Sequence, residues 1–209
     1  MVDTILKVLT PATSIDLISL EQLKVALGIA DTDTSQDAQL TNYITIYSAV
    51  IADELNRTLG YEKMQETVRC LQPSHYYTSH WPVKEDDIDS VESPRGDVYD
   101  PDSYELEEAS GKIELFASRD EPIVVVYSGG YVLPDEAPPT LQACIEIMIR
   151  AARVEARQAA TAGMRSLSHK EARVMFFDPS ASMVKTGSPI ATAADTIAPM
   201  LRPYRRFWV

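Results

Sequence analysis

One apolar stripe limits what the first part of this chain can fold into. From Asp37 to Gly60, large apolar residues recur at intervals of three or four positions, which keeps one face of a long helix apolar. They are Leu40, Ile44, Tyr47, Ile51, Leu55 and Leu59. The stripe predicts a helix over residues 35–60 that is ended by Gly60.

A shorter helix is predicted just before it. Ser19 and Gln22 stand at the spacing of a capping box, and Gly28 follows the last apolar position. We expect this helix over residues 19–28, and we expect it to fold back on the longer one as a helical hairpin.

The apolar period changes after this hairpin. Between residues 61 and 131, apolar residues gather in short runs that are separated by glycines, which is typical of strands. Tyr104–Phe116 should form a hairpin that folds at Ser110–Gly111, and Ile123–Tyr127 is apolar enough to be a central strand. The region 61–131 therefore predicts a small antiparallel sheet inserted between helices.

A third helix is expected over residues 139–160, because Pro138 and Pro139 are tolerated in a first helical turn. Its two sides differ in chemistry, and the apolar side should pack on the first hairpin. The apolar side carries Leu141, Ile145, Met148 and Ala152, and the polar side carries Gln142, Glu146, Arg150, Arg153 and Arg157.

The remaining residues, 161–209, are rich in small residues and proline and contain few large apolar groups. We expect a strand over Ala172–Phe177 and a short helix over residues 189–198 that Pro199 ends, in a segment that becomes ordered on a partner. The predicted fold class is α+β and mainly helical. An antiparallel helical bundle with an inserted small antiparallel β-sheet forms the body, residues 1–160, and an extended C-terminal arm follows.

Charge is divided unevenly along the chain. Residues 1–149 hold 27 Asp and Glu against 9 Lys and Arg, whereas residues 150–209 hold 4 against 10. A body of formal charge −18 joined to a tail of +6 favours docking on other surfaces. The net charge of −12 argues against a free-standing nucleic-acid binder, because binding to phosphates needs a cationic footprint.

The cationic tail ends in residue types that anchor protein interfaces. They are Arg202, Tyr204, Arg205, Arg206, Phe207 and Trp208. We favour an extended arm that binds a partner through these residues. The alternative is a local cluster that covers the body of the same chain.

Three arginines of the third helix, Arg150, Arg153 and Arg157, lie at helical spacing on one face. They could meet the acidic surface of a neighbouring copy of the chain. A solvated helix face is the alternative of equal weight, since exposed ion pairs contribute little.

Residues 85–108 form an acidic tract with eleven carboxylates and a single arginine, Arg95. Its candidates for the lining of a DNA channel, or for an outer rim, are Asp86, Asp87, Asp89 and Glu92. Carboxylates in a channel would repel phosphates and keep DNA from binding. A divalent-cation site at the three aspartates comes third, because the tract lacks the ligand spacing and central glycine of an EF-hand loop. We expect no metal.

The sequence offers little for catalysis. His75 and His80 are five positions apart, which does not place two metal ligands on one helix face, and we interpret them as structural. Ser128-Gly129-Gly130 lacks the Lys-Ser or Lys-Thr of a phosphate-binding loop, and we interpret it as a tight turn that leaves a strand. We expect no enzyme activity and no cofactor.

The two cysteines, Cys70 and Cys144, stand far apart without metal-ligand spacing, which fits a reducing compartment. No stretch approaches the roughly 20 apolar residues needed to cross a bilayer, and the first residues do not form a signal peptide. We expect a soluble chain made inside the cell, without a membrane partner.

The order of these elements and several local strings resemble the head-tail connector (adaptor) proteins of tailed bacteriophages. The strings are Leu17–Leu27 (LISLEQLKVAL), the long helix Asp37–Gly60, Ile123–Tyr131 (IVVVYSGGY) followed by Pro134 and Pro138, Leu141–Arg157 (LQACIEIMIRAARVEAR) and Leu201–Arg205 (LRPYR). The acidic region Pro73–Pro101 is longer than in shorter members of the family.

The resemblance implies a structural virion protein of the neck that is assembled in the host cytoplasm. It implies a homo-oligomeric ring of about a dozen copies beneath the portal protein, through which DNA passes without tight binding. The last helix and tail would insert into the portal, and the opposite rim would receive a tail terminator, a stopper or another tail protein. The alternatives are a tail terminator or another ring protein of the neck or tail and, less favoured, a metal-dependent hydrolase.

Overall fold

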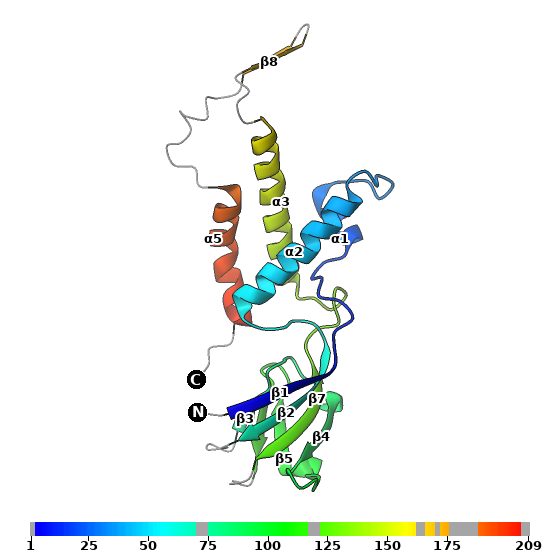
Figure 1. The fold of residues 1–209 in the computed structure, drawn as a ribbon, viewed down its shortest axis with the longest axis vertical. Helices are drawn as coiled ribbons and strands as arrows, with labels where there is room; N and C mark the ends of the chain where they lie inside the picture. Colours follow the sequence, from blue (N-terminus) through cyan, green and yellow to red (C-terminus); the bar gives the residue numbers. More distant parts are fainter. Residues whose placement is uncertain are drawn as a thin grey trace. The chain divides into compact units, whose positions relative to one another are not determined.

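The chain folds into two units, a sheet unit and a helical unit (Figure 1). The structure is a computed structural model that describes residues 3–69, 75–116, 122–161, 166–169, 172–175 and 188–205. The sheet unit contains the residues up to Ser19 and Ser48–Ala137. The helical unit contains Leu20–Tyr47 and Pro138–Arg205.

The larger sheet of the sheet unit has four antiparallel strands in the order β1-β2-β7-β4. They are β1 (Asp3–Thr10), β2 (Glu62–Arg69), β7 (Ile123–Gly129) and β4 (Ile88–Glu92). Buried and half-buried side chains alternate along β7, because successive side chains of a strand point to opposite faces. The prediction of a central strand at Ile123–Tyr127 is confirmed.

A second sheet has three strands in the order β3-β6-β5. They are β3 (His75–Tyr77), β6 (Lys112–Leu115) and β5 (Tyr104–Glu107), and two short 3-10 helices, η1 (Glu85–Asp87) and η2 (Pro101–Ser103), come before β4 and β5. β5 and β6 form the predicted hairpin. The sheet unit therefore contains two small antiparallel sheets where the sequence predicted one.

A hydrophobic core lies inside the sheet unit and draws on strands of both sheets. Its buried members are Met64, Val68, Tyr76, Val83, Val91, Ile113, Leu115, Ile123, Val125 and Tyr127. Burying one large apolar side chain stabilises a fold by about 1.5–3 kcal/mol. Because a slip of one residue would turn a strand's apolar side chains out of the core, this core also fixes the strand register.

The helical unit is built from α1 (Leu20–Leu27), the first part of α2 (Asp37–Leu55), α3 (Pro139–Thr161) and α5 (Pro189–Leu201). α3 contacts both α5 and α1. The buried apolar residues of these helices are Leu23, Leu40, Ile44, Leu141, Cys144, Ile145, Met148, Ile149, Ala152, Ala193, Ile197 and Leu201. Two further strands, β8 (Ser166–His169) and β9 (Ala172–Met175), pair with each other.

All four predicted helices are confirmed, but two of them end elsewhere. α2 stops at Leu55, because the next residue, Asn56, turns into the left-handed region at φ +52°. α5 continues through Pro199 to Leu201. A proline this close to the helix end removes only one backbone hydrogen bond, and burial of Ile197 and Leu201 offsets that loss.

The α+β class is confirmed, and the finer prediction of an antiparallel helical bundle stays a prediction. Strand β1 lies outside the region 61–131 in which the sequence predicts strands. β9 falls within the strand expected at Ala172–Phe177, whose last two residues lie outside the described ones.

Candidate functional site

The structure describes half of the residues predicted for docking. Arg202 and Arg205 are exposed and Tyr204 is half-buried, in and just after the short 3-10 helix η3 (Arg202–Tyr204) that follows α5. The predicted docking residues Arg206, Phe207 and Trp208 lie outside the described residues. The described part thus presents two guanidinium groups at the end of α5.

α5, which carries this segment, is anchored in the helical unit. One of its sides buries Ala193, Ile197 and Leu201, at the spacing of one helix face, and the helix contacts α3. At its start, the Ser188 hydroxyl donates to the Glu155 carboxylate of α3 at 2.5 Å. The docking residues therefore follow a helix that is held by its own unit.

Two of the three arginines on α3 bond within the helical unit. Arg150 donates to the backbone oxygen of Ala26 at 2.6 Å, and Arg153 donates to the side-chain oxygen of Gln36 at 2.9 Å. Arg157 is exposed. Because Ala26 lies in the last turn of α1, where backbone oxygens lack helical partners, Arg150 ties the end of α1 to α3.

A buried lysine that the sequence analysis missed holds the loop between α1 and α2. Lys24 is only 4% exposed, and its ammonium lies 2.6 Å from the Asp37 carboxylate and 3.3 Å from the backbone oxygen of Asp31. Removing one partner of such a buried pair is strongly destabilising. Nothing in the spacing of Lys24 and Asp37 distinguishes this pair from surface charges.

The four acidic candidates are not equivalent. Asp87 accepts a hydrogen bond from the Tyr61 hydroxyl at 2.7 Å, and Asp89 lies 2.9 Å from the Lys63 ammonium. Burial raises the pKa of Tyr61, and the hydrogen bond with Asp87 raises it further. Asp86 is exposed, and Glu92 is half-buried at the end of β4. Two of the four carboxylates thus serve the sheet unit itself.

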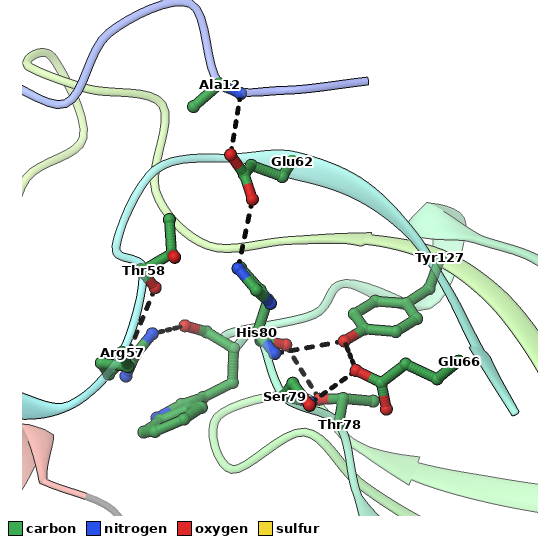
Figure 2. Close-up of polar contacts among 10 residues, drawn as sticks. Ala12, Arg57, Thr58, Glu62, Glu66, Thr78, Ser79, His80 and Tyr127 are labelled. Atoms are coloured by element: carbon green, nitrogen blue, oxygen red, sulfur yellow. Dashed lines mark hydrogen bonds and ion pairs between the residues drawn. The ribbon is translucent and has the colours of Figure 1, made fainter. Parts of the chain in front are cut away.

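A buried polar cluster connects strands and loops of the sheet unit (Figure 2). The Glu66 carboxylate is fully buried and accepts from the Tyr127 hydroxyl at 2.5 Å and from the backbone N–H of Ser79 at 2.8 Å. The backbone N–H of His80 donates to the same Tyr127 hydroxyl at 3.1 Å. Burial, and next the Glu66 carboxylate, raise the pKa of the neighbouring Tyr76 well above its ordinary value.

Glu62 extends this cluster toward the N-terminal segment. One carboxylate oxygen accepts from the backbone N–H of Ala12 at 3.2 Å, and the other lies 3.3 Å from Nε2 of the buried His80 (Figure 2). Nearby, the Arg57 guanidinium lies 3.3 Å over the Trp81 ring and donates to the Trp81 backbone oxygen. These groups hold the loop 78–81 in place, which is a structural role for His80.

The Ser128-Gly129-Gly130 string is a close backbone crossing. The backbone N–H of Tyr131 donates to the backbone oxygen of Leu59 at 2.8 Å, and the backbone N–H of Tyr61 donates to the backbone oxygen of Tyr131 at 2.8 Å. A Cβ on Gly130, which has φ +106°, would lie 2.3 Å from the backbone oxygen of Gly60. The interpretation as a tight turn that leaves a strand is therefore confirmed, since β7 ends at Gly129.

Within the described ranges, no group of three or more His, Cys, Asp or Glu side chains is arranged to hold a metal ion. In that same part of the chain, no helix combines the length and apolar character that a membrane crossing requires. The described site residues thus fall into two groups, exposed charged side chains on the surface and buried polar side chains that hold loops in place.

Part of this chain matches a family of phage proteins. Residues 17–93 match the model of the phage gp6-like head-tail connector protein family. The match covers α1, α2, β2, β3, η1 and β4, which are elements of both units. The resemblance to head-tail connector proteins that the sequence predicts is therefore confirmed over residues 17–93.

Solved structures of gene transfer agent (GTA) particles share the fold. A chain in the virion of a native GTA particle superposes with a TM-score of 0.54 at 13% identity, over 98% of this chain and 96% of that one. A chain in the neck of an empty GTA particle, computed with C6 symmetry, has a TM-score of 0.54 and 13% identity, over 98% of this chain and 97% of that one. A chain in the neck of a native particle, computed with C12 symmetry, has a TM-score of 0.52 and 12% identity, again over 98% of this chain and 97% of that one. A search of curated proteins finds no match.

Proposed function

We propose that this chain is a structural protein of the neck of a phage-type particle, where it connects head and tail. The observation that carries the proposal is the family match over residues 17–93, and the shared fold with neck proteins over 98% of the chain supports it. In this proposal the chain forms a ring on the portal protein and receives a tail terminator, stopper or tail protein on its other side. Proteins of this kind act by binding and do not act as enzymes.

The C-terminal residues are the proposed contact with the portal. The exposed Arg202 and Arg205, and the cationic tail to which they belong, support this role. Arginine and aromatic residues contribute most of the binding energy in many interfaces. The exposed Arg157, with Arg150 and Arg153, is the proposed contact between neighbouring subunits. Asp86 and Glu92, with Asp87 and Asp89, are proposed to face the DNA channel or the rim.

Deleting Arg202–Val209 tests the docking proposal. Because α5 keeps its buried side chains in the truncated chain, we expect an unchanged helical circular dichroism spectrum and complete loss of binding to purified portal. Electron microscopy of the full chain mixed with portal should show added density below the portal ring. Full binding by the truncated chain would contradict the docking role, and binding to tail-tube protein alone would indicate a tail terminator.

A further inference from the structure

The two edges of the four-stranded sheet are held in different ways. At the β4 edge, the backbone N–H of Tyr99 donates to the backbone oxygen of Val91 at 2.8 Å, and Glu92 pairs with Val98. The Val91 side chain is 1% exposed and belongs to the hydrophobic core. At the other edge, β1 pairs with β2 alone among the described strands (Figure 1). The position of β1 therefore depends on one neighbouring strand.

β1 contributes little to the core of the sheet unit. Every residue from Thr4 to Thr10 is exposed, and even Leu6 and Val8 keep 43% and 48% of their surface in solvent. These two lie opposite Glu66 and Met64 of β2, which are fully buried. Apolar burial is the main stabilising contribution in a folded chain. Because β1 buries so little, it is held mainly by its backbone hydrogen bonds to β2.

The segment that follows β1 is held firmly to the sheet unit. The backbone N–H of Ala12 donates to the Glu62 carboxylate at 3.2 Å, and that of Leu17 donates to the Ser48 hydroxyl oxygen at 3.0 Å. The Leu17 side chain is 0% exposed. A Cβ built on Gly60 would lie 2.6 Å from the Cβ of Ala12, so the two backbones pass in close contact. This segment is a fixed point at the end of β1.

The chain between β1 and this fixed point is suited to bending. The pairing register shifts between Val8 and Thr10, which leaves Leu9 outside the regular ladder. Pro11, the next residue after the strand, has no backbone N–H to donate. Residues 9–11 therefore join a regular strand to a fixed segment through a short stretch with few backbone hydrogen bonds.

We propose that β1 is a detachable strap, which leaves β2 as one unit by bending at residues 9–11 while β2, β7 and β4 stay paired. Segments with few buried apolar contacts open at a lower free-energy cost than the whole fold. Opening exposes the N–H and C=O groups of β2 that bond to β1, so β1 acts as a cover that can be withdrawn from β2. This device lies within one unit of the free chain, and it goes beyond the proposed function without depending on it.

Hydrogen exchange followed by NMR on the full chain tests the opening. Successive residues of a central antiparallel strand direct their backbone groups alternately to one neighbour and to the other, so β2 carries its own control. We expect the β2 N–H groups that bond to β1 to exchange about 100-fold faster than those that bond to β7, because only the first set is released by local opening. Equal rates for the two sets would show that β1 leaves only when the whole sheet unfolds, which would overturn the proposal.

A reversible tether tests whether β1 moves as one unit. Lys7 and Gln65 lie opposite each other near the middle of the two strands, and both are replaced by cysteine in a Cys70→Ser background that retains the buried Cys144. After oxidation, we expect exchange of all β2 N–H groups that bond to β1 to slow about tenfold or more, because the disulfide restricts the opened strand. Those that bond to β7 should not change.

The same double variant in its reduced form is the matched control, and its exchange rates should equal those of the wild-type chain. If oxidation slows exchange only beside the tether, the ends of β1 fray separately and the strand does not move as a unit. If oxidation slows neither set, the exchange of β2 does not depend on β1 at all. Either result would contradict the strap.

Discussion

Glu66 organises one corner of the sheet unit. Its fully buried carboxylate accepts from the Tyr127 hydroxyl and from the backbone N–H of Ser79. A buried donor that loses its acceptor keeps the full cost of its lost hydration, so removing the acceptor costs more than the net value of one hydrogen bond. The position of the loop at Ser79 therefore depends on one side chain of β2.

Substituting Glu66→Leu should lower the free energy of unfolding by about 1–3 kcal/mol, because the buried Tyr127 hydroxyl and the half-buried backbone N–H of Ser79 lose their acceptor. Urea unfolding followed by circular dichroism measures the change. Glu105→Leu, at an exposed position of β5, is the control and should change stability by less than about 0.5 kcal/mol. The double variant Glu66→Leu, Tyr127→Phe should lose less stability than the sum of the losses in the two single variants, since each substitution removes the same contact. Additive losses would contradict the direct bond.

At the scale of elements, Gly130 sets how β7 leaves the sheet. The backbone there passes so close to Gly60 that a Cβ would lie 2.3 Å from the Gly60 oxygen. Gly28, which ends α1, also has positive φ at +68°, but no atom lies within 4 Å of a Cβ built on it. Alanine substitutions at the two positions therefore distinguish two costs, because Gly28 tests the positive φ alone and Gly130 tests the positive φ together with a steric clash.

Substituting Gly130→Ala should lower the free energy of unfolding by about 3 kcal/mol or more, because backbone strain and a clash with a backbone atom combine. Gly28→Ala should cost only about 1 kcal/mol, from the backbone conformation alone. Thermal unfolding of both variants in one buffer gives the comparison. Equal losses would show that the Gly60 contact is easily relieved.

The elements show which parts of the fold could be predicted from the sequence. α1, α2 and α3 follow from local spacing, and the β5–β6 hairpin follows from its turn, because these signals lie within a few residues of each other. β1 could not be predicted, since its residues do not alternate and its partner β2 begins at Glu62. The Glu62–His80 and Lys24–Asp37 contacts join distant residues and leave no mark in a local pattern. For the same reason the roles of the acidic candidates had to come from the structure.

At the scale of the whole molecule, the uneven charge that underlies the proposed docking also has a cost in stability. Residues 1–19 and 48–137 of the sheet unit hold 22 acidic and 8 basic residues, and like charges crowded on one small unit repel each other in the folded state. Salt screens such repulsion between exposed charges. The stability of the free chain should therefore depend on ionic strength.

Raising NaCl from about 20 mM to about 500 mM should increase the unfolding temperature by several degrees, because screening relieves the repulsion. A variant with Asp86→Asn, Asp102→Asn and Glu105→Gln, all at exposed positions, should unfold at a higher temperature in low salt and respond less to added salt. Differential scanning calorimetry measures both effects. A lower unfolding temperature at high salt would show that attractive ion pairs outweigh the repulsion.

The stacking of Arg57 on Trp81 has a practical consequence. The chain has two tryptophans, and the other one, Trp208, belongs to the segment removed in the truncated chain. Emission from that truncated chain then comes from the indole of Trp81 alone, which sits beneath a guanidinium in the sheet unit. The difference between the fluorescence spectra of the full and truncated chains gives the emission of Trp208. Tryptophan fluorescence can therefore report binding of a partner to the C-terminal segment without an added label.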